Sequence, residues 1–197
     1  MTSSDVMKEF KRKKRVSDML ITAHSILGER YRRVSVGFDI ALMLISFFIL
    51  VASLLEVAAP GFVKDQLGDW TVYAIPVCAA LIFVLSVIEW RISWKQKSEA
   101  HFSSARTYTS FKAEITALLS KGFDEGDLEA VKVEDRYDKL GQTCVQIPHD
   151  KFVKLKRAHL RKVALSKLLD DQPFANLTIL RIRLAMKDTK KGWKSVD

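Results

Sequence analysis

The sequence has few of the residues from which disulfide scaffolds, metal centres and catalytic sites are built. Its 197 residues include two cysteines and four histidines, too few for a disulfide framework and without the spacing of a metal site. Glycine-rich phosphate loops, a G-x-S-x-G elbow and an H-E-x-x-H helix do not occur. Cys144 precedes His149 by five residues, and we interpret this pair as structural rather than as a nucleophile with its base. We therefore expect no enzyme activity and no cofactor.

Two long runs with little charge are the main feature that the sequence does have, over residues 38–59 and 70–90. At a rise of 1.5 Å per residue, each run forms a helix of roughly 30 Å, which matches the hydrocarbon core of a bilayer. Neither run has the polar stripe that a helix of a soluble bundle turns toward water. Trp70, Tyr73 and Trp90 lie at the ends of the second run, where aromatic rings prefer the headgroup layer. We predict two transmembrane helices.

Positive charge lies outside the two runs and is nearly missing between them. The net charge is +9, residues 1–37 hold nine Lys and Arg, and the link of residues 60–69 holds only Lys64. Because Lys and Arg beside a span favour the cytoplasmic side, we expect both termini in the cytoplasm and the link on the opposite side. Since 37 residues precede the first run, we do not expect it to be a secretory signal.

Apolar residues recur at helical spacing on both sides of the two runs. Residues 1–37 predict a cytoplasmic amphipathic helix from about residue 4 to 36, and residues 91–122 predict a juxtamembrane helix ending at Lys121 and Gly122. The positions expected to face inward are Val16, Met19, Leu20, Ala23, Ile26, Leu27, Tyr31 and Val34 in the first helix, and Phe102, Ala105, Tyr108, Phe111, Ile115, Leu118 and Leu119 in the second.

Residues 123–197 predict a basic helical region. Its acidic beginning lacks the ligand spacing of a calcium loop, and we interpret it as a solvated turn. We expect a short helix to about Leu140, a basic helix over residues 150–169, and a final helix over residues 174–186 with Pro173 at its first position. The predicted fold class is an all-α membrane protein, with a two-helix transmembrane hairpin and N-terminal and C-terminal cytoplasmic amphipathic helices.

Polar residues follow one side of each apolar run. Positions seven residues apart differ by only about 20° around a helix, so such residues form a polar seam. The seams consist of Asp39, Ser46, Ser53 and Glu56 in the first run, and of Thr71, Cys78, Ser86 and Glu89 in the second. Polar side chains in a bilayer face other helices or water. Helix packing is the interpretation that spacing alone favours; the alternative is an oligomer whose seams line a conducting path.

Basic patches allow a similar choice between two interpretations. Lys154, Arg157 and Arg161 share a helix face, with Lys162 beside them. A solvated face is the ordinary interpretation of such a pattern, and a phosphate-bearing ligand or an acidic partner surface is the alternative. For the basic run of residues 11–15 we favour contact with anionic lipid over nucleic acid, so nucleic acid is not an expected partner.

Three segments carry a family resemblance: ERYRRVSVGFD before the first run, VLSVIEW at the end of the second, and SEAHFSSARTYTSFKAEI after it. Over roughly residues 23–119 the chain resembles the SLATT family of two-span membrane proteins, which is named for its association with SMODS nucleotidyltransferases and SLOG nucleotide sensors. The most specific pieces are Ser86 with Glu89, and the Ala100–His101 pair. The remainder, about residues 121–197, has no such likeness.

The resemblance implies an oligomeric effector of a bacterial conflict or antiphage system, located in the inner membrane. Such proteins are thought to permeabilise the membrane once a nucleotidyltransferase or nucleotide-sensor partner is triggered. By this likeness the two seams become pore or packing residues, and Tyr31, His101 and the adjacent Arg32 and Arg33 become candidates for coupling the cytoplasmic helices to the spans. A non-conducting membrane scaffold that docks a cytoplasmic partner is the alternative function.

Overall fold

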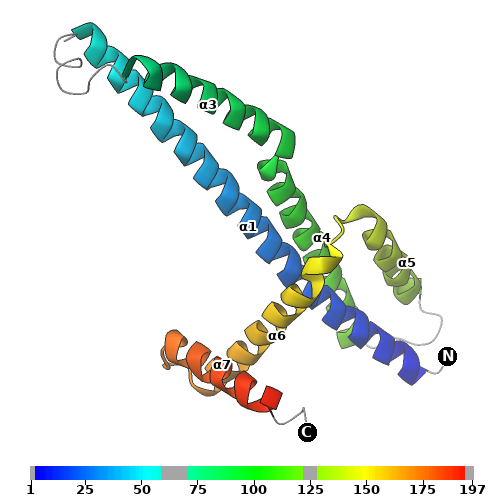
Figure 1. Ribbon diagram of the computed structural model, residues 1–197. Helices are drawn as coiled ribbons and strands as arrows, with labels where there is room; N and C mark the ends of the chain where they lie inside the picture. Colours follow the sequence, from blue (N-terminus) through cyan, green and yellow to red (C-terminus); the bar gives the residue numbers. More distant parts are fainter. Residues whose placement is uncertain (1–2, 59–70, 122–127, 194–197) are drawn as a thin grey trace. The chain divides into compact units, whose positions relative to one another are not determined.

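The computed structural model describes residues 3–58, 71–121 and 128–193, and within these ranges the chain is helical with short links and no strand. The helices are α1 (Ser3–Ala58), α3 (Thr71–Ile92), α4 (Trp94–Lys121), α5 (Leu128–Thr143), α6 (His149–Asp171) and α7 (Leu177–Trp193) (Figure 1). The all-helical prediction is therefore confirmed. The predicted link with Lys64, Gly122 and most of the acidic turn lie outside the described residues.

The chain divides into two compact units, one formed by residues 27–102 and the other by residues 1–26 together with 103–197. Helix α1 contributes to both because it continues without a break. No proline occurs in the sequence before Pro60, and good helix formers such as Lys, Arg, Leu and Met fill much of the segment. The predicted N-terminal helix and the first apolar run therefore belong to a single helix.

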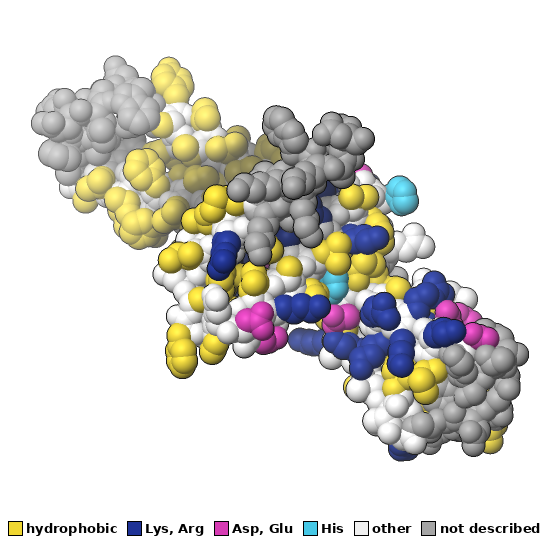
Figure 2. Space-filling view, turned by 90° about the horizontal axis from the view of Figure 1, so that it is seen from below, with side chains coloured by type: hydrophobic (Ala, Val, Ile, Leu, Met, Phe, Trp, Pro, Cys, Tyr) yellow, Lys and Arg dark blue, Asp and Glu magenta, His cyan; other side chains and the backbone are white. Residues whose placement is uncertain are grey.

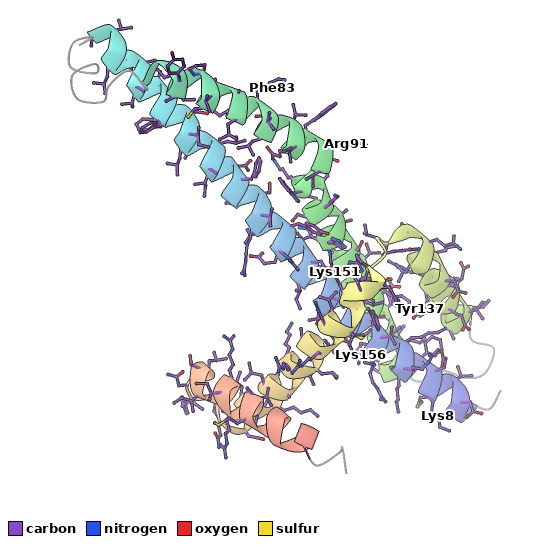
Figure 3. All side chains as sticks on the ribbon, in the orientation of Figure 1. Lys8, Phe83, Arg91, Tyr137, Lys151 and Lys156 are labelled. Carbon is purple, nitrogen blue, oxygen red and sulfur yellow. The ribbon has the colours of Figure 1, made fainter. Side chains whose placement is uncertain are left out.

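In the unit of residues 27–102, α1 and α3 are long and apolar enough to cross a membrane, and no residue of their most apolar windows is buried. Phe48 on α1 is 67% exposed and Phe83 on α3 is 70% exposed. Figure 2 shows hydrophobic side chains covering its fainter, more distant part, and Figure 3 shows them projecting outward along α3 around Phe83. Apolar surface of this extent needs an apolar environment or a partner.

Ser93 separates α3 from α4 and changes the direction of the chain (Figure 1). Its φ of 52° lies in the left-handed region, which residues with a Cβ rarely adopt. Two hydrogen bonds hold this conformation: the Ser93 amide donates to the carbonyl oxygen of Glu89 over 2.8 Å, and the hydroxyl donates to that of Trp90 over 2.9 Å. The second apolar run and the juxtamembrane helix are thus two helices joined by one residue.

The core of the other unit lies where α1, α4 and α5 meet. Phe111 and Ile115 of α4 are fully buried, and Phe10, Tyr108, Leu118 and Leu140 complete the cluster. The buried residues of α4 follow the three- and four-residue spacing of one helix face, which keeps them against the same neighbours. The predicted inward positions Ala105, Tyr108, Phe111, Ile115 and Leu118 are confirmed as buried.

The prediction for the first part of α1 was less accurate. Phe10 is buried although it was not among the predicted inward positions, whereas Ile26 is 38% exposed and Val34 is 42% exposed. The buried face also contains polar residues, namely Lys13, Ser17, Thr22 and His24. The predicted positions Ala23 and Leu27 are buried and Leu20 packs against the core, so the apolar stripe identified only part of the face that packs.

The last two helices differ from the prediction mainly at the start of α7. The basic helix α6 is confirmed, with Leu155 as its buried residue. Helix α7 begins at Leu177 instead of residue 174, because the side-chain oxygen of Asn176 accepts a hydrogen bond from the Thr178 amide over 2.9 Å and so caps the helix. Pro173 lies in the turn before it and Phe174 is fully exposed. The helix continues to Trp193, beyond the predicted end at residue 186.

Candidate functional site

Tyr31 and His101, the two predicted coupling residues with aromatic rings, lie against each other in the unit of residues 27–102. Their ring centroids are 5.6 Å apart and their planes differ by 4°. His101 is 4% exposed and comes from α4, while Tyr31 comes from α1. We name the group around this stack the juxtamembrane cluster, formed by Gly28, Tyr31, Ser98, His101 and Phe102.

Gly28 lets α1 and α4 approach closely within this cluster. The hydroxyl of Ser98, which is 4% exposed, donates to the carbonyl oxygen of Gly28 over 2.9 Å. A Cβ atom placed on Gly28 would lie 3.2 Å from ring atoms of Phe102. A side chain in this place would collide with the ring or push the helices apart. Sequence reasoning missed both Gly28 and Ser98, although a small residue beside an apolar run is a usual sign of close helix packing.

A second aromatic contact lies nearer to the apolar runs. Phe38 of α1 and Trp94 of α4 have ring centroids 5.0 Å apart, with the planes tilted by 54°. Trp94 is the first residue of α4, directly after the break at Ser93. Tilted rings at this distance attract each other beyond the area they bury. The contact therefore holds the start of α4 on α1.

Arg32 and Arg33 lie outside the juxtamembrane cluster. Both are exposed and both bind the carboxylate of Glu29, Arg32 through its Nε at 3.0 Å and Arg33 through its Nε at 3.1 Å. The hydrogen bonds from Arg32 and Arg33 lower the pKa of Glu29 below its usual value. The predicted coupling residues are therefore of two kinds: an aromatic pair, with His101 buried and Tyr31 half-buried, and an exposed basic pair on the surface of α1.

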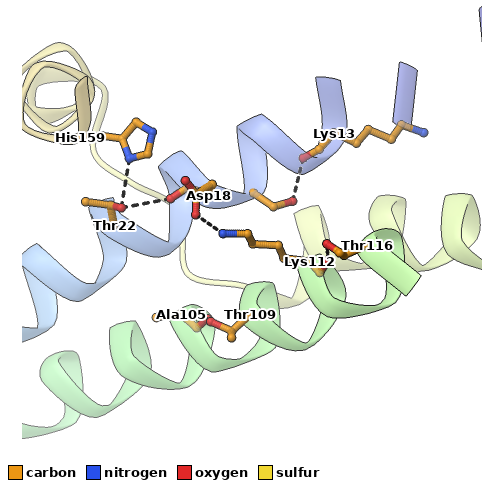
Figure 4. A network of polar contacts seen from close by, with 9 residues as sticks. Lys13, Asp18, Thr22, Ala105, Thr109, Lys112, Thr116 and His159 are labelled. Atoms are coloured by element: carbon orange, nitrogen blue, oxygen red, sulfur yellow. Dashed lines mark hydrogen bonds and ion pairs between the residues drawn. The ribbon is translucent and has the colours of Figure 1, made fainter. Parts of the chain in front are cut away.

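A polar network links α1 to α4 and α6 in the other unit (Figure 4). Lys112 of α4 forms an ion pair with Asp18 of α1. The hydroxyl of Thr22 donates to the carbonyl oxygen of Asp18 over 3.1 Å, and Nδ1 of His159 lies 3.1 Å from the same hydroxyl. Since a hydroxyl has only one hydrogen to donate, Nδ1 of His159 carries the hydrogen and donates to Thr22. His159, a predicted inward position of α6, thus ties that helix to α1.

Tyr108 and Cys144 place a hydroxyl and a thiol next to each other at the edge of the core. His24 stacks on Tyr108 with ring centroids 5.7 Å apart. Burial, with the nearby Cys144 thiol, raises the pKa of Tyr108 to about 12. Burial also raises the pKa of Cys144, while Ser104 and Tyr108 act in the opposite direction. A raised pKa makes the thiolate scarcer, which is the opposite of what a thiol nucleophile needs.

The structure does not join the two polar seams. Asp39, Ser46 and Ser86 are exposed, and Ser53, Cys78 and Glu89 are half-buried; the side chains of Glu56 and Thr71 lie outside the described ones. The hydroxyl of Ser86 donates to the carbonyl oxygen of Ile82 in its own helix over 2.8 Å. Among the described side chains, no hydrogen bond runs from one seam to the other. The exposed seam residues are therefore available to a partner helix or to water.

The predicted basic residues of α6 are all exposed. Arg161 and Lys162 line a cleft against α7, whereas Lys154 and Arg157 are not among its lining residues. In the described parts of the chain, no three His, Cys, Asp or Glu side chains come together in a group that could hold a metal ion.

Comparison with known proteins identifies no relative of this chain. No protein-family model matches the chain, and neither a curated protein nor a solved structure matches it.

Proposed function

We propose that this protein is a two-span membrane effector that oligomerises and permeabilises the bacterial inner membrane in response to a signal at its cytoplasmic helices. In this proposal α1 and α3 form a transmembrane hairpin, and both termini lie in the cytoplasm. The observation that carries the proposal is the continuity of α1. One unbroken helix contains both the packed residues of the cytoplasmic part, such as Phe10, and the exposed apolar residues of the first run, such as Phe48.

Continuity supports a signalling role because a helix is stiff along its axis. A trigger that shifts the first part of α1 must also shift or rotate the apolar part, unless the helix breaks. The close contact of Gly28 with Ser98 and the stack of Tyr31 on His101 hold α4 to α1 at the base of the runs. A change of packing there is the two-state element that a signal would bias.

Permeabilisation would require several copies of the chain. Two helices cannot enclose a pore, and exposed polar residues such as Asp39 and Ser46 need a partner helix or water in a bilayer. The likeness to SLATT proteins supports the same function and suggests a nucleotidyltransferase or nucleotide sensor as the triggering partner. The exposed seams support a homo-oligomer whose polar sides face one another.

Dye release from liposomes tests the proposal. The purified chain is inserted at increasing density, with insertion verified by flotation, and the leak is measured. We expect leak to rise steeply with density and to fall when Ser46→Leu and Ser53→Leu are combined. The matched control is Ala41→Leu, on the opposite side of the same helix. Absence of leak at every density, with the protein inserted, would contradict the proposal.

A non-conducting scaffold is the second candidate, and one observation favours it. Because Ser86 donates to Ile82 of its own helix, its hydroxyl does not require a polar partner. A scaffold predicts that seam substitutions leave function intact, whereas reversing the charge of Lys154, Arg157 and Arg161 abolishes partner docking. The effector predicts the reverse order of effects in a cellular assay.

A further inference from the structure

A cleft between α6 and α7 combines cationic and apolar side chains. It has a volume of about 390 Å³ and is lined by Arg161, Lys162, Leu165, Arg181, Leu184 and Ala185. Clefts that hold small molecules commonly measure several hundred Å³ and place a few polar groups over an apolar floor. Among the described residues that line the cleft, the polar groups are three cations, the floor is leucine and alanine, and none is acidic.

Helix α6 carries an excess of positive charge. It holds seven Lys or Arg and three Asp, and the three Asp lie at its two ends. Some cations elsewhere in the same unit have carboxylate partners, as Lys13 has Glu134 at 2.7 Å. In the described part of the chain, neither Lys162 nor Arg181 forms an ion pair. Figure 2 shows Lys and Arg side chains gathered beside one another in the foreground. Like charges brought together by folding are stabilised by an anion placed between them.

The position of the cations around α6 concentrates this charge on one side. At about 100° per residue, Arg161 and Lys162 point to the side of the cleft, and Leu165 lies between them. Lys156 and Lys167 lie on the opposite side of the same helix and do not line the cleft. The turn before α7, with its Asn176 cap, brings Arg181 back against α6.

We propose that this cleft binds a phosphate group attached to an apolar or aromatic moiety. The guanidinium groups of Arg161 and Arg181 match phosphate oxygens in a bidentate manner, and Lys162 adds a point charge. Leu165 and Leu184 receive the apolar part of the ligand. Such a ligand is either a soluble phosphate ester or an anionic phospholipid headgroup with the first carbons of its chains. The site goes beyond the proposed function, because it does not require the protein to permeabilise a membrane.

Protection of lysine amines from acylation tests the site directly. The full chain in neutral detergent micelles is treated with an acylating reagent, and the modification of each lysine is followed by mass spectrometry. One arm adds phenyl phosphate, with inorganic phosphate as the probe without an apolar part. The other arm adds phosphatidylglycerol to the micelles, with phosphatidylcholine as the zwitterionic control. By mass action, a ligand at ten times its Kd slows the acylation of Lys162 about tenfold, while Lys156 reacts as before.

The two arms separate the sources of the phosphate. Protection of Lys162 by phenyl phosphate assigns a soluble ligand, and protection by phosphatidylglycerol but not by phosphatidylcholine assigns a lipid headgroup; either result supports the site. Combining Arg161→Gln with Arg181→Gln should weaken the binding about tenfold or more. The matched pair Lys156→Gln and Lys167→Gln, which removes equal charge from the opposite side, should change it about twofold at most.

Three results would overturn the proposal. They are the absence of protection in both arms, equal protection of Lys156 and Lys162, and equal weakening by the two double variants. The first two come from the unmodified chain, so they do not depend on whether a variant folds.

Discussion

Replacing Gly28 is the sharpest test of the close approach between α1 and α4. Gly28→Leu puts a branched side chain where even a Cβ would lie 3.2 Å from the Phe102 ring. The added atoms force the helices apart or turn Phe102 out of its position, and overpacking of this kind costs about 1–3 kcal/mol. Separation also breaks the 2.9 Å hydrogen bond from Ser98 to the Gly28 carbonyl, which costs about 1 kcal/mol more.

One opposing contribution must be subtracted. Glycine inside a helix is about 1 kcal/mol less favourable than leucine, so the substitution regains roughly that amount from the helix itself. The net expectation is a loss of about 1–3 kcal/mol. At about 2–4 °C per kcal/mol for a chain of this size, the midpoint of thermal unfolding should fall by about 2–12 °C. Circular dichroism in neutral detergent measures it.

Gly37 provides the matched control within the same helix. A Cβ on Gly37 meets nothing within 4 Å, so Gly37→Leu gains helix propensity without a collision. We expect its midpoint to stay unchanged or to rise, opposite in sign to Gly28→Leu. Equal effects at the two glycines would refute the argument, because the packing around Gly28 would then contribute nothing. If the proposed function is correct, Gly28→Leu should also change liposome leak while Gly37→Leu does not.

Three further predictions concern the packed helices of the unit formed by residues 1–26 and 103–197. Phe111→Ala, at a fully buried position, should cost about 3–5 kcal/mol in chemical denaturation; a loss below about 1 kcal/mol would contradict the assigned core. The pKa of Tyr108 is raised to about 12 in the folded protein, so the folded state holds the phenol proton more tightly than the unfolded state does. The free energy of unfolding should therefore be constant below about pH 10 and fall by about 2–3 kcal/mol as the pH rises toward 12. Tyrosinate absorbance compared with Tyr108→Phe checks it, and ionisation of Tyr108 near pH 10 would contradict it. The raised pKa of Cys144 predicts slow alkylation at neutral pH in a Cys78→Ala background and fast alkylation after unfolding in urea; equal rates would show that the thiol is not protected.

The helices themselves were largely predictable from the sequence. In α4 the residues that pack are apolar and recur at three or four positions, so Tyr108, Phe111, Ile115 and Leu118 could be identified from spacing alone. The two apolar runs were equally visible, because their composition differs from that of the rest of the chain. That the two runs span a membrane is inferred from this composition and is part of the proposed function.

The packing face of α1 could not be predicted in the same way, because part of it is polar. Ser17 and Thr22 donate their hydroxyls to carbonyl oxygens one turn earlier, at Lys13 and Asp18, and Thr22 is also bound by His159 of α6, so both hydroxyls can be buried. His24 is buried against the ring of Tyr108. A pattern of hydrophobicity does not identify such polar residues, and the stripe drawn from apolar positions was incomplete for this reason, although Ala23 and Leu27 are buried as predicted. The start of α7 was missed because Asn176 supplies the cap, although Pro173 was the more conspicuous helix-start signal.

Helices α1 and α3 differ in how they would carry a displacement from the juxtamembrane cluster. Helix α1 has no proline and no break from Ser3 to Ala58, so a shift at Gly28 is passed along its axis. The other path is interrupted at Ser93, where a left-handed residue held by two hydrogen bonds joins α4 to α3. Changing the angle at this joint costs the two hydrogen bonds that hold Ser93, whereas α1 resists a kink through the regular backbone hydrogen bonds along its whole length. If the proposed function is correct, α4 follows α1 while α3 keeps its orientation, and α1 is the element through which the trigger acts.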